Sequence, residues 1–136
     1  MIPNKNYSEE YALSFLPHRI AESVRKAAAL YRGNINEVRL RTDCPVYITA
    51  GNKNVKCSAG CTQDEMLSVV RSLCGNSLYC HSETIKEGYI CTSCGLRAGV
   101  CGRAVTENGK IISVTDITSV SIRRIIVISI IRTATG

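Results

Sequence analysis

Residues 88–121, GYICTSCGLRAGVCGRAVTENGKIISVTDITSVS, restrict the fold more than any other part of the chain. Apolar residues alternate there with polar or basic ones, which is typical of strands with one buried face. Asn108-Gly109 predicts a two-residue hairpin turn. We therefore expect three strands, over residues 89–92, 96–106 and 110–117, and a further strand over residues 121–131.

The residues before this stretch predict two helices and a second group of strands. A helix is expected to begin at Pro17 and to stop at Gly33, with Tyr31 on its buried face. Alternating residues predict strands over residues 34–41, 46–50 and 55–58. Thr62 and Glu65 have the spacing of a capping box at the start of a second helix.

A third helix is expected over residues 78–87, ahead of the final strands. The predicted order is helices, strands, helices and strands, without regular strand–helix alternation. Such an order is typical of an α+β fold. We predict a mainly antiparallel sheet with helices packed on one face.

The chain is basic, with a net charge of +6 and a pI near 9.0. This balance favours anionic partners, although the charges are spread along the chain and are not interleaved with aromatic residues, so we do not expect direct nucleic-acid binding. Residues 1–11 lack the apolar core of a secretory signal, and no segment approaches the ~20 apolar residues of a membrane span. We expect a cytoplasmic protein with free thiols.

The eight cysteines raise the question of a metal site. Cys91 and Cys94 form a CxxC pair, and Cys57 and Cys61 offer a second pair, so a four-thiolate zinc site is one alternative. The stronger interpretation is that most are small core residues, including those at 44, 74, 80 and 101, because only one CxxC is present. Redox catalysis by Cys91 and Cys94 is a further alternative, although their CxxC spans a predicted turn and not a helix start.

Several short motifs occur together and in order. They are Leu16-Pro17, residues 36–41 (NEVRLR) followed by Pro45-Val46, Ser77-Leu78-Tyr79, residues 87–90 (EGYI), the strand RAGVCGRAV at 97–105, and residues 116–123 (DITSVSIR). In this combination the chain resembles the stage III sporulation protein AA family of spore-forming Firmicutes.

The resemblance implies a fold and a role. Members of that family look like secretion ATPases, in which an N-terminal domain similar to the PAS-like domain of type II and type IV pilus ATPases precedes a motor domain that binds ATP and Mg²⁺. The family is implied to support a mother cell-to-forespore channel, with self-association and with other stage III sporulation proteins as partners, at the membrane around the forespore.

The same resemblance suggests site residues. Arginines of such N-terminal domains can approach a nucleotide bound by the adjoining domain, and Arg97, Arg103 and Arg123 occupy the expected positions. Arg39 and Arg41, which alternate out of one strand, form a second group. The alternative is that all five are solvated strand residues.

The sequence departs from the family pattern at two places. Cys94 stands where the family is expected to have glycine, and residues 125–136 form an atypical apolar tail, as if the reading frame had shifted or the gene were cut short. We therefore divide the chain into a domain over residues 1–124 and a tail over 125–136.

No Gly-x-x-x-x-Gly-Lys-[Ser/Thr] motif occurs, so the cradle that would hold a triphosphate is missing. We expect no intrinsic ATP hydrolysis and no cofactor in this chain. The preferred function is an assembly and regulatory domain of a sporulation ATPase, and the alternative is a small basic module that binds zinc or nucleic acid.

Overall fold

The computed structural model describes residues 12–31, 35–92 and 96–124. They form a six-stranded sheet with the order β3-β2-β1-β6-β5-β4, in which every neighbouring pair is antiparallel. The strands are β1 (Ile35–Arg41), β2 (Pro45–Ala50), β3 (Lys53–Gly60), β4 (Tyr89–Cys91), β5 (Leu96–Glu107) and β6 (Lys110–Arg124). The helices are α2 (His18–Ala29), α3 (Gln63–Leu73), α4 (Ser82–Lys86) and the 3₁₀ turn η1 (Leu78–His81).

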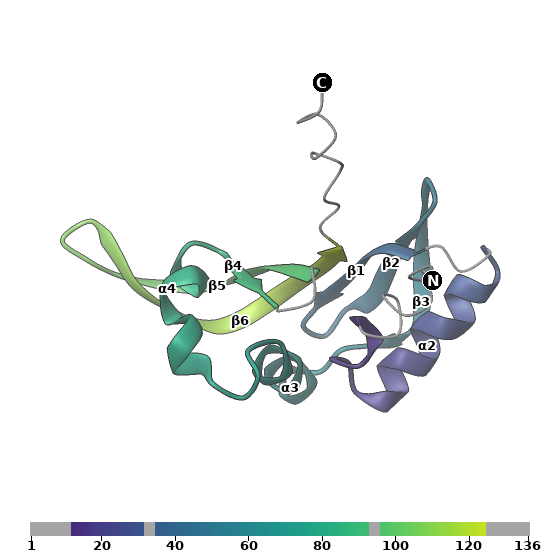
Figure 1. The fold of residues 1–136 in the computed structure, drawn as a ribbon, viewed down its shortest axis with the longest axis horizontal. Coiled ribbons are helices and arrows are strands. Elements are labelled where there is room, and N and C mark those ends of the chain that lie inside the picture. Colours follow the sequence, from purple (N-terminus) through teal and green to yellow (C-terminus); the bar gives the residue numbers. More distant parts are fainter. Residues whose placement is uncertain (1–11, 32–34, 93–95, 125–136) are drawn as a thin grey trace, which may run out of the picture.

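The sheet consists of two three-stranded meanders that meet at its centre. Strands β1–β3 form one meander and β4–β6 the other, and the pairing of β1 with β6 joins them. Helices α2, α3 and α4 lie along the same side of the sheet (Figure 1). The prediction of an α+β fold with an antiparallel sheet and helices on one face is therefore confirmed.

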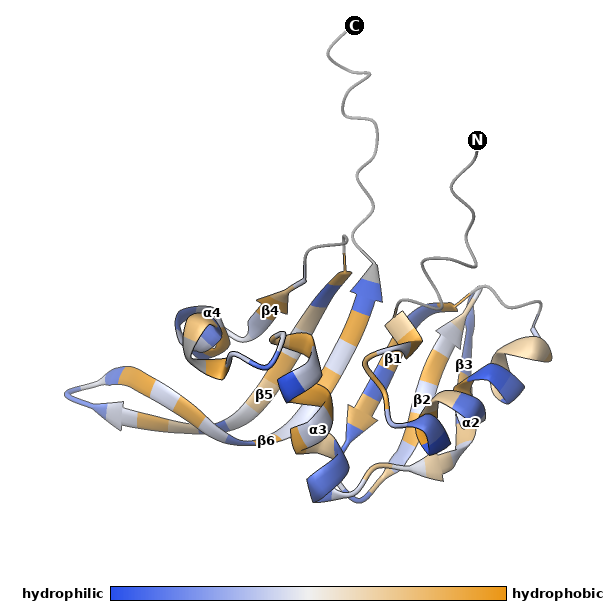
Figure 2. Ribbon diagram, turned by 60° about the horizontal axis from the view of Figure 1, so that its bottom comes forward, coloured by the Kyte–Doolittle hydropathy of each residue, from blue (hydrophilic) through white to orange (hydrophobic). Residues whose placement is uncertain are grey.

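The core lies between the helices and the sheet because each strand alternates. In β1, Val38 and Leu40 are buried, whereas the charged residues between them face the other side. Ile20 and Val24 of α2 and Val69 of α3 are completely buried against this apolar face. The alternation of hydrophobic and hydrophilic residues along the strands is visible in Figure 2.

Two local sequence signals have the expected geometry. The side chain of Thr62 accepts a hydrogen bond from the backbone N–H of Glu65, and the Glu65 carboxylate accepts one from the N–H of Thr62, so the capping box is confirmed. At the β5–β6 turn, Asn108 and Gly109 have φ angles of 52° and 77°. This left-handed backbone is what a tight hairpin turn needs.

Two of the predicted helices have different bounds in the structure. The helix expected to begin at Pro17 and to stop at Gly33 corresponds to α2, which ends at Ala29 and leaves Tyr31 exposed beyond its C-terminus. The predicted helix over residues 78–87 is divided into η1 and α4. The part of the predicted last strand beyond Arg124 lies outside the described residues.

The two predicted strands over 110–117 and 121–131 are one strand as far as the structure describes them, because β6 continues from Lys110 to Arg124. At Asp116 its φ is 48°, opposite a bulge between Cys101 and Arg103. Beyond this bend, β6 also pairs with β1. On the other side of the bend, β5 and β6 project as a long hairpin arm, residues 103–115 (Figure 1).

Within the described residues, no helix has both the length and the apolar character needed to cross a membrane.

Candidate functional site: the open face of the sheet

The open face is the side of the sheet opposite the helices, and a row of cross-strand neighbours defines it. Successive partners in this row, from β3 to β4, are Lys56, Tyr47, Arg39, Ser121, Gly99 and Tyr89. Side chains of directly opposed residues lie on the same face of a sheet. The pairing therefore brings residues from all six strands into one line.

A second row runs beside the first and contains two of the three arginines predicted to approach a nucleotide. Glu37 is opposite Arg123, and Arg123 is opposite Arg97. Arg123 donates a hydrogen bond of 2.9 Å to the Glu37 carboxylate, which also accepts one from the Ser121 hydroxyl. The structure therefore brings Arg97 and Arg123 together, with an acidic residue on one side of the pair.

These contacts control the ionisation of Glu37. Burial by itself would raise its pKa, but the hydrogen bonds from Ser121 and Arg123 and the positive charge of Arg123 outweigh burial and lower it. Glu37 is therefore a carboxylate at neutral pH and neutralises one of the two arginines. Arg97 has no carboxylate partner among the described residues.

Two arginines of the open face are held against tyrosine rings. The Arg39 guanidinium lies 5.8 Å from the centre of the Tyr47 ring, and that of Arg97 lies 4.6 Å from the centre of the Tyr89 ring. Such cation–π contacts orient the guanidinium but leave its net positive charge in place. Arg39 also donates to the side-chain oxygen of Asn54.

A trough of about 760 Å³ lies beside the first of these pairs, and Arg39 and Tyr47 both line it. Its floor includes Gly99, Ser119 and Ser121, whose small side chains leave room above the centre of the sheet. Arg39 and Arg41 line it, and none of its described lining residues is acidic. The chain's two histidines lie in α2 and η1, on the helix side. The arginines make the trough suited to binding an oxyanion.

Arg103, the third predicted arginine, lies elsewhere. It is on the hairpin arm, beyond the bulge in β5, with 75% of its side chain exposed and 3.8 Å from the Asp116 carboxylate. Six residues of extended strand separate it from Arg97, which corresponds to roughly 20 Å. The structure does not bring Arg103 into contact with the other two.

The cysteines proposed for zinc are also separated. Cys57 lies in the edge strand β3 and Cys61 directly follows it, whereas Cys91 lies in β4 at the opposite edge. Five strand spacings correspond to roughly 24 Å, far more than one zinc ion can bridge. Cys94 lies outside the described residues. No cluster of three or more potential metal ligands occurs in the part of the chain that the structure describes.

The interpretation of most cysteines as core residues holds only in part. Cys57, Cys61 and Cys74 are buried, but Cys80 and Cys101, which were expected to be in the core, are exposed. The misassignment arises because apolar neighbours in sequence do not reveal which strand face, or which end of a helix, is covered. Cys44 is half-buried.

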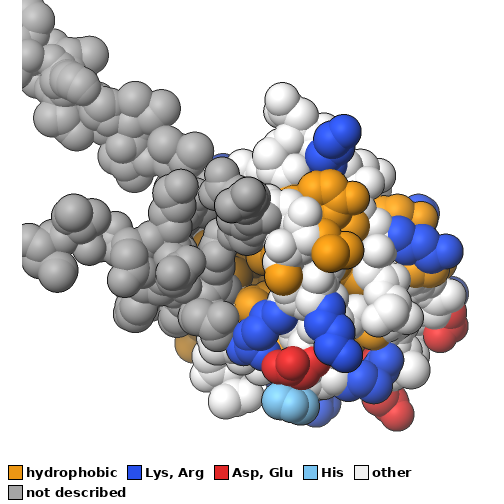
Figure 3. All heavy atoms as spheres, turned by 90° about the vertical axis from the view of Figure 1, so that its right-hand side faces the viewer, with side chains coloured by type: hydrophobic (Ala, Val, Ile, Leu, Met, Phe, Trp, Pro, Cys, Tyr) orange, Lys and Arg blue, Asp and Glu red, His pale blue; other side chains and the backbone are white. Residues whose placement is uncertain are grey.

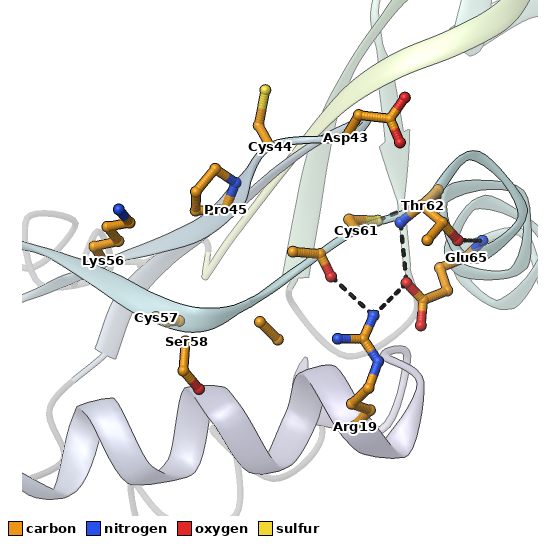
Figure 4. Close-up of a pocket in the computed structure, with 12 residues that line it drawn as sticks. Arg19, Asp43, Cys44, Pro45, Lys56, Cys57, Ser58, Cys61, Thr62 and Glu65 are labelled. Carbon is orange, nitrogen blue, oxygen red and sulfur yellow. Dashed lines mark hydrogen bonds and ion pairs between the residues drawn. The ribbon is translucent and has the colours of Figure 1, made fainter.

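A second hollow lies where α2, β3 and α3 meet (Figure 4). Arg19 of α2 donates to the Glu65 carboxylate at 2.6 Å and to the Gly60 carbonyl at 3.0 Å. Glu65 also caps α3 through Thr62, so one arginine links three elements. Burial raises the pKa of the neighbouring Cys61 to about 11. Its thiol is neutral at pH 7, and this hollow is a structural junction with no activated nucleophile.

Charges of both signs occur on the side of the molecule that faces right in Figure 1. Lys and Arg side chains there lie beside Asp and Glu side chains (Figure 3). On α2, Arg25 and Glu22 form an ion pair with a separation of 2.5 Å.

Sequence reasoning identified the arginines of the open face but missed Tyr47, Tyr89 and the small floor residues. Their period-two spacing in their own strands was the available signal. That spacing assigns a residue to one of two faces, but it does not reveal which strands are neighbours. The strand order was needed to place them together.

Comparison with a solved structure gives a weak similarity. The Legionella pneumophila ATPase DotB has a TM-score of 0.47 and 14% sequence identity to this chain, covering 82% of this chain and 29% of that one. A similarity of this size does not establish a shared fold or activity, and the PAS-like assignment stays a prediction.

Sequence comparison is more decisive. The stage III sporulation protein AA of Bacillus subtilis (strain 168) is 35% identical over 89 residues, which are 65% of this chain and 29% of that protein. The chain therefore matches less than a third of this relative's length. A family profile described as "Sporulation stage III, protein AA" matches residues 9–133, which includes part of the segment that we set apart as a tail. This match covers most of the sequence, and the chain belongs to the stage III sporulation protein AA family.

Proposed function

We propose that this chain acts as the N-terminal assembly and regulatory domain of a stage III sporulation AA-like ATPase that supports a mother cell-to-forespore secretion channel. Its partners are copies of itself and other stage III sporulation proteins at the membrane around the forespore. ATP and Mg²⁺ belong to a motor domain outside these residues, because the 136 residues contain no phosphate-binding loop. Membership of the family is the main support for this role.

The observation that supports a nucleotide contact is the pairing of Arg97 with Arg123. Like charges directly opposite each other on a sheet repel. Glu37 neutralises only one of them, so an added oxyanion would relieve the repulsion. Guanidinium groups bind phosphate oxygens through paired N–H donors. The pair adjoins the C-terminal end of β6, where a following motor domain would be attached.

Arg103 remains a candidate for the same role. From the arm it would reach a nucleotide along a different path from that of the pair, and its contact with Asp116 is exposed. Exposed ion pairs contribute about 0–1 kcal/mol, so little would be lost if Arg103 exchanged Asp116 for a phosphate.

A chimera tests this function. The matching segment of the Bacillus subtilis protein is replaced by residues 12–124 of this chain, and spore yield is measured in a strain that lacks the original protein. We expect the chimera to restore spores. The double change Arg97→Gln and Arg123→Gln should lower the yield and the ATP hydrolysis of the purified chimera.

Arg71→Gln is the matched control, because Arg71 is an exposed arginine on α3, on the helix side of the sheet. It should leave both measurements unchanged. A chimera that yields no more spores than the deletion strain would contradict the shared role. Equal activity of the double variant and the parent chimera would contradict the nucleotide contact.

A further inference from the structure

The trough on the open face carries positive charges in a regular line. Arg39 and Arg41 are two residues apart in β1 and point to the same side. Arg123, which lies opposite Glu37, does not line the trough. Alternate residues of a strand are about 6.8 Å apart, so guanidinium groups repeat along the trough at this interval.

Little within the described residues balances these charges. Arg41 has no hydrogen-bond or ion-pair partner there. Arg39 donates to a neutral amide and lies over an aromatic ring, and the carboxylate that attracts its charge is that of Glu37, which already pairs with Arg123. The Nε atom of Arg39 is buried without a hydrogen-bond partner. None of the described residues that line the trough carries a negative charge. A ligand that carries negative charge would complement these arginines.

The tyrosines help to identify that ligand. Binding of single-stranded nucleic acid usually depends on aromatic rings that stack with bases. Here the Tyr47 and Tyr89 rings are half-buried, and each already has a guanidinium of this chain over it. An extended polypeptide needs no such ring. Its side chains on one face repeat every ~6.8 Å, which is the spacing of the arginines.

We propose that the trough docks an acidic, extended segment of a partner protein. Carboxylates at alternate positions of that segment pair with Arg39 and Arg41, and its backbone lies over the small floor formed by Gly99, Ser119 and Ser121. This site uses arginines that take no part in the nucleotide contact proposed above. The two proposals can therefore fail separately.

Binding of labelled peptides to the full 136-residue chain tests the proposal. The first probe is a synthetic peptide in which glutamate alternates with threonine. The second has the same composition but places its glutamates in one block, and the third replaces glutamate by lysine. By fluorescence anisotropy we expect the alternating acidic peptide to bind most tightly, with an affinity that falls as salt is added.

Two variants locate the interaction. Changing Arg39→Gln and Arg41→Gln together should weaken binding about tenfold, as expected for two partly exposed charge pairs. Arg71→Gln, on the helix side, should leave it unchanged. Arg39 is half-buried, so its replacement could also disturb the fold, whereas Arg41 is exposed. The single change Arg41→Glu therefore provides a second test. It should weaken binding of the acidic peptide while the far-UV circular dichroism spectrum stays the same.

Three outcomes would overturn the proposal. One is equal binding of the alternating and block peptides, and another is unchanged affinity in the arginine variants. The third is displacement of the acidic peptide by oligothymidylate or ATP at lower concentrations than the unlabelled peptide itself requires, which would identify the trough as a nucleic-acid or nucleotide site.

Discussion

At the scale of single residues, Glu37 is the acidic residue that contacts an arginine and a serine of the open face. It holds Arg123 and Ser121, and it is the acidic neighbour of a pair of arginines. Its side chain is only 19% exposed, so its contacts are less screened by water than those of surface ion pairs. Loss of its charge would leave Arg97 and Arg123 facing each other without compensation.

Glu37→Gln should lower the free energy of unfolding by about 1 kcal/mol at neutral pH, because a charge-assisted hydrogen bond is lost. The pKa of Glu37 is lower in the folded state, so its contribution is present above the unfolded pKa and disappears as pH falls through the folded pKa. The difference between the variant and the wild type should therefore shrink in acid. Urea denaturation at neutral pH and at about pH 3 measures it.

Glu83→Gln is the control for this change, because Glu83 is 81% exposed and pairs with Lys86 on the surface. It should have little effect at either pH. If Glu37→Gln lowered the free energy of unfolding by the same amount in acid as at neutral pH, the negative charge of Glu37 would not be the source of its contribution to stability.

At the scale of elements, the β5–β6 hairpin changes direction where it leaves the sheet. A Cβ atom at Gly102 would lie 2.5 Å from the Thr115 carbonyl oxygen and 2.9 Å from the Ile117 Cα, both of them backbone atoms. The close approach accompanies the bulge after Cys101 and the left-handed backbone of Asp116. Glycine at this position therefore permits the bend that separates the arm from the sheet.

Gly102→Ala should reduce the free energy of unfolding by roughly 1–3 kcal/mol, because backbone atoms must move to make room. Gly99→Ala is the matched control in the same strand, since the nearest atom to its added Cβ would be 4.0 Å away. Its stability should change by less than about 0.5 kcal/mol. Equal urea midpoints for the two variants would show that the bend does not depend on glycine.

At the scale of the whole molecule, packing of the helices against the sheet leaves some cysteines buried and others exposed. Cys57, Cys61 and Cys74 are buried, and burial raises the pKa of each thiol. The other class, Cys80, Cys91 and Cys101, is exposed. Alkylation requires a thiolate that the reagent can reach. Folding should therefore protect the buried cysteines, because their thiols are inaccessible and because their raised pKa values leave less thiolate.

Native protein treated with iodoacetamide should be modified at Cys80, Cys91 and Cys101 and protected at the three buried positions. Peptide mapping by mass spectrometry after a short reaction measures each site separately. Addition of urea should make all six react at similar rates, which serves as the control for intrinsic reactivity. Rapid modification of Cys57 or Cys61 in native protein would contradict the packing of β3 against α2.

Local signals predicted much of this structure because they act over a few residues. The alternation around Val38 and Leu40 assigned the buried face of β1, and Thr62 with Glu65 marked the start of α3. Asn108-Gly109 placed the hairpin turn. Each signal depends on backbone geometry or on neighbours in sequence, and so it could be read without knowing the fold.

The candidate site needed information of another kind. Only the pairing of β1 with β6 puts Arg39 beside Ser121, and only the order of the strands separates Cys57 from Cys91 by the full width of the sheet. Past Asp116, β6 pairs with both β5 and β1, and no local signal in the sequence indicates this second partner. Periodicity in a sequence assigns each side chain to a face, whereas the choice of neighbouring strand is made by packing between residues far apart in the chain.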